Sequence, residues 1–246
     1  MKATIFLGSL KNSQRDSHSA ALAKIVQKEL IEQGFKTVDL YNLRSIEYEP
    51  GVDIKTEGGE ADGMTEALSK VLDSDCVIFA TPIWWGVHSS LIQAFMERMC
   101  YYDDFAIKTA ISPIYGKTFG AIISGSDDGF QQVTGLLLNF ATNLGFTIPP
   151  DAIVPSTVQD LGEIKRDIRT QQHIAIFSRN ITAWTQMLRR RKIGAEIQIN
   201  REPRPAYMGA EDTETPVTTA PMPVTPVEAR TEPAATVPTV RDYVKE

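Results

Sequence analysis

Hydroxyl side chains and two cations gather near the start of the sequence, directly after an apolar run. Ser9, Ser17 and Ser19 can donate hydrogen bonds to phosphate oxygens, and Lys11 or Arg15 can add positive charge. This segment leads into the N-terminus of an expected helix, where free amides and the helix dipole favour a phosphate. It therefore predicts a phosphate-binding loop, although it matches neither the Walker A nor the G-x-G-x-x-G pattern. The structural alternative is that Ser17 or Ser19 only caps the helix.

Two adjacent tryptophans follow a second apolar run. A flat aromatic ligand would bury Trp84 and Trp85 and use their stacking surfaces, and Pro82 and Gly86 would shape the backbone so that its amides face the ligand. The alternative is that both indoles fill the core beneath the loop. His88, near the start of the next helix, could polarise a substrate or serve the structure alone.

A third loop, residues 124–130, follows a third apolar run and is rich in small residues. Small residues let the backbone approach a ligand closely. Asp127 or Asp128 could instead cap the helix that follows. Because ligands bind beyond the carboxyl ends of parallel strands, the three loops are expected to form one crevice.

Short apolar runs alternate with amphipathic segments, which is typical of an α/β fold with a mainly parallel sheet. Five such strands, with helices on both faces, fit a flavodoxin-like sheet of order 2-1-3-4-5. Residues 42–63 are expected to be a loop, and the last helix is expected to break near residues 178–180. Strands are expected at residues 4–7, 36–40, 76–80, 117–124 and within 146–154, and helices at 19–33, 65–72, 89–99, 131–144 and 161–191.

Composition excludes several classes of protein. The chain has 246 residues and a formal net charge of -6, which is unfavourable for non-specific nucleic-acid binding. Two cysteines, Cys76 and Cys100, suggest neither a disulfide framework nor a metal cluster, and the three histidines lie far apart. The apolar part of the first residues is too short for a signal peptide, and no stretch approaches a membrane span of about 20 apolar residues. A cytoplasmic location is expected.

The end of the chain differs in composition. Eight of the fourteen prolines lie after residue 201, mixed with Thr, Glu and Ala. Such a segment cannot bury enough apolar surface to offset its ordering entropy. We expect a domain at residues 1–195 and a disordered tail at 196–246, which is passive, a linker or a peptide ligand. The basic run at residues 189–192 is either the favoured cationic end of a helix or a docking patch.

These segments resemble the NADPH-dependent FMN reductase branch of the flavodoxin-like superfamily over about residues 1–190. The most specific part is Pro-Ile-Trp-Trp-Gly at residues 82–86 with the helix behind it, residues 91–98. The Gly-Ser pair at residues 8–9, Gly-Lys at 116–117 and Ser-Gly at 124–125 also fit. The chain lacks the Thr-Gly-Asn-Thr loop of electron-carrier flavodoxins, which favours an enzyme.

The resemblance implies a binding site for FMN. Ser9, Lys11, His18 and Ser19 match the phosphate loop, to which the chemistry of the segment adds Ser17. The isoalloxazine loop corresponds to Pro82, Ile83, Trp84, Trp85 and Gly86, and the loop at the far side of the ring to Ser124, Gly125 and Gly129.

The resemblance also implies a reaction. NADH or NADPH would deliver a hydride to flavin N5, and the electrons would pass to a quinone, a free flavin, or an azo or nitro compound. Because the flavin carries this chemistry, no catalytic side chain is expected. No metal is expected either, because the sequence has no metal-ligand spacing. Flavin sites of this family are often completed by a second subunit, so we expect a homodimer or homotetramer. A flavodoxin-type carrier without nicotinamide activity, or a scaffold whose tail binds a partner, are the alternatives.

Overall fold

The fold is known from a computed structural model that describes residues 1–11, 13, 15, 17–56, 59–109, 112–126, 128–158 and 160–191. The described residues all belong to one compact unit, Met1–Ala206. The predicted tail at residues 196–246 lies outside the described residues, and the domain boundary at residue 195 stays a prediction.

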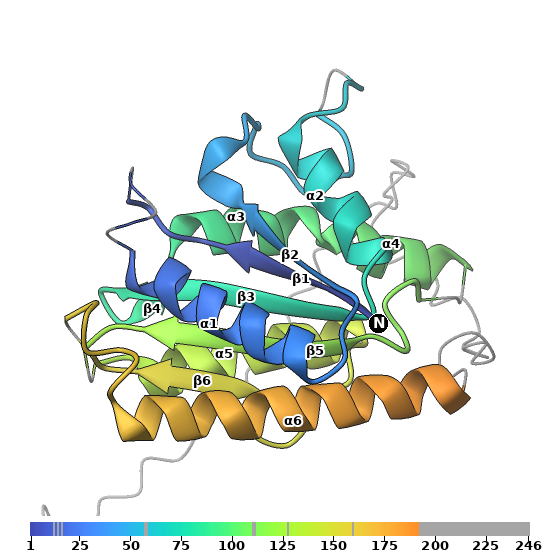
Figure 1. Cartoon of the computed structure of the whole chain (residues 1–246). Helices are drawn as coiled ribbons and strands as arrows, with labels where there is room; N and C mark the ends of the chain where they lie inside the picture. Colours follow the sequence, from blue (N-terminus) through green and yellow to red (C-terminus); the bar gives the residue numbers. More distant parts are fainter. Residues whose placement is uncertain are drawn as a thin grey trace, which may run out of the picture. The chain divides into compact units, whose positions relative to one another are not determined.

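One parallel sheet runs through the domain, in the order β2-β1-β3-β5-β6. Its strands are β1 (Lys2–Leu7), β2 (Thr37–Asn42), β3 (Cys76–Trp84), β5 (Thr118–Ser124) and β6 (Ile153–Ser156). A two-residue strand, β4 (Val87–His88), pairs antiparallel with β3. Counting only the parallel strands, this is the predicted order 2-1-3-4-5. The carboxyl ends of the strands point to one edge of the sheet, on the left in Figure 1.

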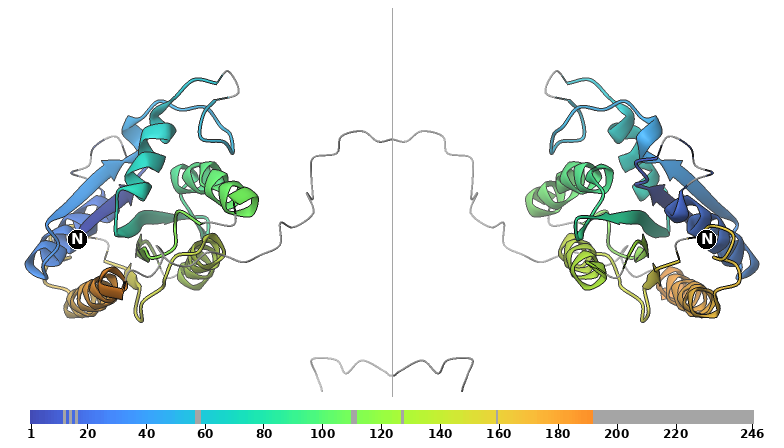
Figure 2. Two further views of the ribbon diagram at one scale, coloured as in Figure 1. Left: turned by 90° about the vertical axis from the view of Figure 1, so that its right-hand side faces the viewer. Right: turned by 90° about the vertical axis from the view of Figure 1, so that its left-hand side faces the viewer.

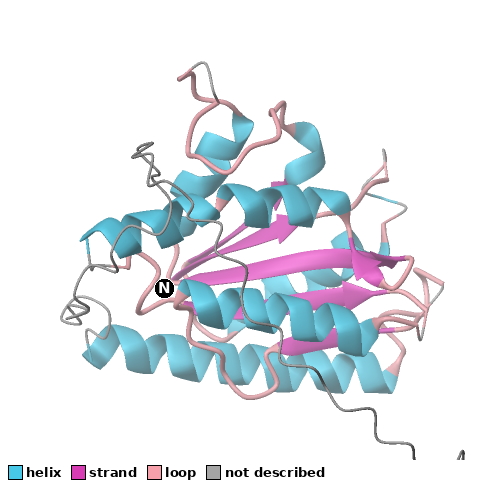
Figure 3. Cartoon of the chain, turned by 180° about the vertical axis from the view of Figure 1, so that it is seen from behind, coloured by secondary structure: helices cyan, strands magenta, loops and turns pink. Residues whose placement is uncertain are grey.

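Helices cover both faces of this sheet, as Figure 2 shows edge-on. On one face, α1 (His18–Glu32) and α6 (Ile168–Arg191) pack against each other and against the sheet. The other face, seen in Figure 3, carries α2 (Gly63–Leu72), α3 (Ser90–Arg98), α4 (Cys100–Thr109) and α5 (Phe130–Leu144). The central strands are buried on both sides, which explains their continuous apolar sequences.

Aromatic rings fix the second face to the sheet. Phe6 of β1, Phe79 of β3 and Phe95 of α3 form a cluster with ring centroids 4.5 to 6.2 Å apart, and Phe119 of β5 packs edge-on against Phe79 at 5.1 Å. Phe95 meets Phe6 and Phe79 in tilted arrangements, and these ring contacts pack α3 against the strands. The helix behind the two tryptophans is thereby held in place.

Some expected boundaries are wrong. The strand expected at residues 76–80 continues to Trp84, where it turns back into β4. The last strand, expected within residues 146–154, begins at Ile153, after the two prolines at residues 149 and 150, and ends at Ser156, beyond the expected range. A 3-10 turn, η2 (Leu43–Ser45), lies within the expected loop.

The helices differ from expectation in two places. The last helix begins at Ile168, not at residue 161, and it is not broken near residues 178–180. Ser178 is buried inside the continuous helix, and the Asn180 side-chain amide donates to the Pro150 carbonyl at 2.9 Å. The helix α4 was not expected from the sequence. Its Tyr102 is buried and donates to the Leu68 carbonyl at 2.6 Å, a tertiary contact that local periodicity does not reveal.

No helix in the described part of the chain is both long enough and apolar enough to span a bilayer.

Candidate functional site

A pocket with a cavity volume of about 250 Å³ lies at the carboxyl edge of the sheet, where the loops after β1, β3 and β5 meet. It brings together every predicted site residue except Trp85, Gly86 and Gly129. Leu10, Ser126 and Val158 complete it. The lining residues are Ser9, Leu10, Lys11, Ser17, His18, Ser19, Pro82, Ile83, Trp84, Ser124, Gly125, Ser126 and Val158.

Buried hydroxyl groups form one end of this pocket. Ser9, Ser17, Ser19 and Ser124 are all buried. The Oγ atoms of Ser19 and Ser124 lie 2.7 Å apart and share a hydrogen bond, although the two residues are 105 positions apart in the sequence. The predicted phosphate loop therefore meets the loop after β5 through these side chains.

Ser17 caps α1, as the structural alternative proposed. Its Oγ accepts a hydrogen bond from the Ala20 amide at 3.2 Å. This bond uses an oxygen lone pair, so the hydroxyl hydrogen of Ser17 stays available as a donor. In the Ser19–Ser124 pair one hydroxyl donates and the other accepts, which leaves one further hydrogen to donate. Helix capping and phosphate binding are therefore compatible in this loop.

Glycines bring the loops of the site into contact. A Cβ at Gly129 would lie 2.6 Å from the Cα of Gly86, and both glycines have positive φ angles, 89° and 77°. A Cβ at Gly125 would lie 2.9 Å from the Cβ of Ile83. The loop after β5 thus packs directly on the β3–β4 hairpin. Side chains at Gly125 and Gly129 would push the loop and the hairpin apart.

The two tryptophans stand at the tip of that hairpin and do not fill the core. Trp84 is 46% exposed and Trp85 is 98% exposed. Trp85 adopts a φ of 52°, in the left-handed region that a bulky residue rarely occupies. The core-filling alternative is therefore wrong: the fold presents both indoles at the surface, where their apolar area can be covered by something that binds there.

An open apolar pocket of about 460 Å³ adjoins the hairpin. Leu10 and Trp84 line both this pocket and the hydroxyl-rich one, so the two are neighbours. His88 also lines it but is itself buried, with Nδ1 3.3 Å from the Ser89 carbonyl oxygen. The remaining lining residues are Trp85, Val87, Ser90, Gln93 and Leu136.

Asp128 does not cap α5, so the capping alternative is wrong for this residue. The N-cap of α5 is Gly129, which makes no side-chain capping bond. Asp128 instead accepts a hydrogen bond from the Ser126 hydroxyl at 2.6 Å, and Asp127 lies outside the described residues. This leaves glycine backbone at the start of α5, beside Gly86 of the hairpin.

Two cysteines and the basic run are the other reactive or charged groups that the sequence singled out. Burial raises the pKa of Cys76 to about 12, and burial together with Asp103, Asp104 and Glu97 raises the pKa of Cys100, so both thiols are protonated at neutral pH. The described residues contain no cluster of three or more His, Cys, Asp or Glu side chains that could hold a metal. The basic run ends α6 as the helix-dipole interpretation requires, and Arg189 lies 3.4 Å from Asp75.

The residues of the pocket fit FMN. Buried hydroxyls at the start of a fifteen-residue helix, with Lys11 beside them, are a donor set for a phosphate monoester. The exposed indoles beside this pocket offer apolar surface to a flat isoalloxazine ring. The close contacts at Gly125 and Gly129 place backbone, not side chains, near that ring. Sequence reasoning missed Leu10 and Val158. Val158 lies just after β6, the strand next to β5. Including the carboxyl end of this strand in the expected crevice would have identified it.

Fold and site define a flavodoxin-like α/β protein with a hydroxyl-rich pocket at the switch point of its sheet. The chain belongs to the NADPH-dependent FMN reductase family, whose profile matches residues 1–159. This confirms the resemblance seen in the sequence and supports an FMN-dependent oxidoreductase.

Individual proteins are similar to this chain in sequence or in structure. The chain is 28% identical over 159 residues to the 8-demethyl-8-aminoriboflavin-5'-phosphate synthase of Streptomyces davaonensis, covering 62% of each protein. It is 28% identical over 156 residues to a Mycobacterium bovis protein named divalent metal cation transporter MntH, covering 62% of this chain but 22% of that protein. The matches thus span less than two thirds of these relatives. The crystal structure of RosB with bound 8-demethyl-8-formylriboflavin-5'-phosphate superposes with a TM-score of 0.65 at 23% identity, covering 77% of this chain and 81% of RosB.

Proposed function

We propose that this protein binds FMN and catalyses electron transfer from NADPH or NADH to a small acceptor such as a quinone, a flavin, or an azo or nitro compound. One observation carries the proposal: four buried serines and the half-exposed Trp84 line the same pocket. The serines are Ser9, Ser17, Ser19 and Ser124. Family membership supports it. The name of the Streptomyces relative, which concerns a flavin 5'-phosphate, supports the same ligand class.

Each part of the site has a distinct task in this proposal. The serine hydroxyls and the first amides of α1 hold the phosphate, and Lys11 balances its charge. The backbone of the hairpin and of residues 124–126 faces the ring edge, and Trp84 covers an apolar surface of the ring. When bound, FMN supplies the two-electron redox chemistry, so the protein provides binding, orientation and a partly dry surface.

The open pocket next to the hairpin is the proposed place for the reacting end of the donor and for the acceptor. Its walls are mostly apolar, with Val87 and Leu136 partly exposed. Flat, poorly hydrated rings fit such a surface. The same exposed apolar residues, with Trp85, support a homodimer or homotetramer in which a second copy shields the site.

The proposal is tested by steady-state oxidation of NADPH with added FMN and a benzoquinone acceptor. We expect turnover that requires FMN and falls when Ser9→Ala and Ser19→Ala are combined. Exposed Ser69→Ala, on α2 and outside the pocket, serves as the matched control. FMN binding without any NADPH or NADH oxidation would refute the enzymatic part and favour an electron carrier.

A further inference from the structure

A cavity of about 780 Å³ lies at the carboxyl edge of the sheet, on the far side of the loop that follows β5. It is larger than the hydroxyl-rich pocket and has no role in the function proposed so far. Its volume falls within the roughly 300–1,000 Å³ of small-molecule sites. Three segments build it: the start of α5, the end of β6 and the start of α6. The lining residues are Gly129, Phe130, Gln131, Gln132, Pro155, Thr157, Asp167, Arg169 and Thr170.

The same two segments line both pockets, each with different residues. The loop after β5 contributes Ser126 to the hydroxyl-rich pocket and Gly129 to the large cavity, and the segment after β6 contributes Val158 to the first and Thr157 to the second. Gly129 also packs on Gly86 of the tryptophan hairpin. A ligand long enough to reach from the hairpin into the cavity would therefore pass along a continuous edge of the protein.

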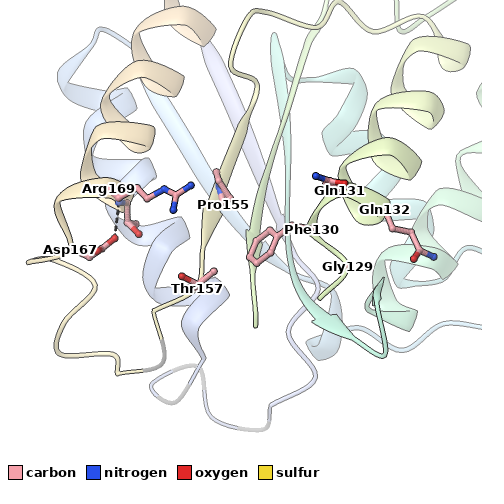
Figure 4. Close-up of a pocket in the computed structure, with 9 residues that line it drawn as sticks. Gly129, Phe130, Gln131, Gln132, Pro155, Thr157, Asp167 and Arg169 are labelled. Carbon is pink, nitrogen blue, oxygen red and sulfur yellow. Dashed lines mark hydrogen bonds between the residues drawn. The ribbon is translucent and has the colours of Figure 1, made fainter. Parts of the chain in front are cut away.

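Arg169 gives the cavity its charge character. Figure 4 shows its guanidinium projecting from the start of α6 toward Pro155 and Thr157. Among the described residues, no salt bridge engages Arg169. The nearby Asp167 is committed to the helix, because its carboxylate accepts a hydrogen bond from the Thr170 amide at 2.7 Å. The charge of Arg169 acts on Asp167, whose pKa it helps to lower after the hydrogen bonds from Thr170, but the guanidinium fork itself is in no salt bridge with another described residue and matches a phosphate monoester.

The opposite wall offers surfaces for a nucleobase. Phe130 faces the cavity across from Arg169, and Gln131 and Gln132 follow it on α5 (Figure 4). An aromatic ring can stack on a base, and carboxamides can donate to and accept from its edge. Phosphate recognition on one wall and base recognition on the other describe a nucleoside monophosphate.

We propose that this cavity binds the adenosine 2'-phosphate end of NADPH and that Arg169 makes the enzyme prefer NADPH over NADH. The inference rests on the proposed function, because it assigns the adenosine end of the proposed electron donor to this cavity. Arg169 is then a specificity residue, which touches the 2'-phosphate and takes no part in the electron transfer.

The test measures binding and kinetics on the full-length, FMN-loaded protein. Adenosine 2'-monophosphate and adenosine 5'-monophosphate are titrated by calorimetry into the wild type, Arg169→Ala, Arg169→Lys and Arg179→Ala. Arg179 is exposed on the same helix and lies outside the cavity, so it is the matched control.

We expect the 2'-phosphate to bind the wild type and the Arg179→Ala variant equally and to bind Arg169→Ala about tenfold more weakly, as loss of a charge-assisted hydrogen bond implies. Arg169→Lys should fall between them, because it keeps the charge and loses the fork. In kinetics, KM for NADPH should rise about tenfold in Arg169→Ala with kcat and the KM for NADH unchanged.

Three results would overturn the inference: no binding of adenosine 2'-monophosphate to the wild type, equal binding of the 5' isomer, or an equal rise of KM for NADPH and NADH. Competition by inorganic phosphate at the same concentration would also overturn it, since it would mean a simple anion site. The calorimetry needs no turnover. If neither nicotinamide is oxidised, the proposed function fails, while the cavity is judged by its ligand alone.

Discussion

Removing the hydroxyls of Ser9 and Ser19 tests the phosphate end of the site. Both side chains are buried in the hydroxyl-rich pocket, and Ser19 shares a 2.7 Å hydrogen bond with Ser124. Ser9→Ala and Ser19→Ala each remove one donor to a dianionic phosphate. A hydrogen bond to a charged group contributes about 1.5–3 kcal/mol, which corresponds to about a 10- to 150-fold rise in Kd for FMN per serine.

The two substitutions should differ in their effect on the free energy of unfolding. Ser19→Ala leaves the Ser124 hydroxyl without its partner in a buried site, which costs about 1–3 kcal/mol of unfolding free energy when nothing replaces the bond. The Oγ of Ser9 accepts only a long bond, 3.4 Å from the Lys11 amide, so Ser9→Ala should change stability little. Ser9→Ala therefore separates FMN affinity from folding.

The assay is quenching of FMN fluorescence on titration with apoprotein, together with urea unfolding of each apoprotein variant. The exposed Ser69→Ala on α2 should match the wild type in both measurements. The reasoning is refuted if Ser9→Ala binds FMN with wild-type Kd. It is equally refuted if the two variants lose affinity only in proportion to their lost stability.

Three further predictions concern the hairpin, the N-cap of α5 and the N-cap of α2. Trp85→Gly should weaken FMN binding yet raise the unfolding free energy by about 1 kcal/mol, because glycine relieves the positive φ of a side chain that is 98% exposed; calorimetric melting and FMN titration check both. Gly129→Ala should lower the unfolding free energy by about 1–3 kcal/mol and weaken FMN binding, since its Cβ would lie 2.6 Å from Gly86; an unchanged urea midpoint would contradict this. Burial raises the pKa of Asp62, but amide hydrogen bonds and Arg98, 2.6 Å away, outweigh it and hold the pKa below its usual range. Its stabilising effect is therefore present above about pH 4 and is lost as the pH falls through the lowered pKa, so the stability difference between wild type and Asp62→Asn should shrink from pH 7 to pH 3 in urea titrations.

Much of the site could be predicted because its chemistry lies in loops that end strands. Once β1, β3 and β5 were recognised by their apolar runs, the parallel topology placed Ser9, Trp84 and Ser124 at one edge. The hydroxyls of Ser19 and Ser124 meet across 105 positions for this reason. Residue type and strand order together were enough to predict most residues of the hydroxyl-rich pocket.

Other features depend on contacts that no local pattern contains. Nothing in the sequence distinguishes an indole buried under a loop from one standing at a hairpin tip, and β4 has only two residues, too few to show a period. The helix α4 owes its place to Tyr102 and its bond to Leu68. The Arg169 cavity is lined by three segments that are separated in the sequence between residues 129 and 170, so only the folded chain reveals it.

The central claim is that bound FMN accepts electrons from a nicotinamide donor on this protein. The most direct measurement is the absorbance spectrum of the FMN-reconstituted full-length chain, recorded anaerobically while NADPH and then NADH are added. The account predicts that flavin co-purifies or binds in equimolar amount and that the oxidised-flavin band disappears with NADPH. A protein that binds no FMN, or whose bound flavin stays oxidised with both donors, would contradict it.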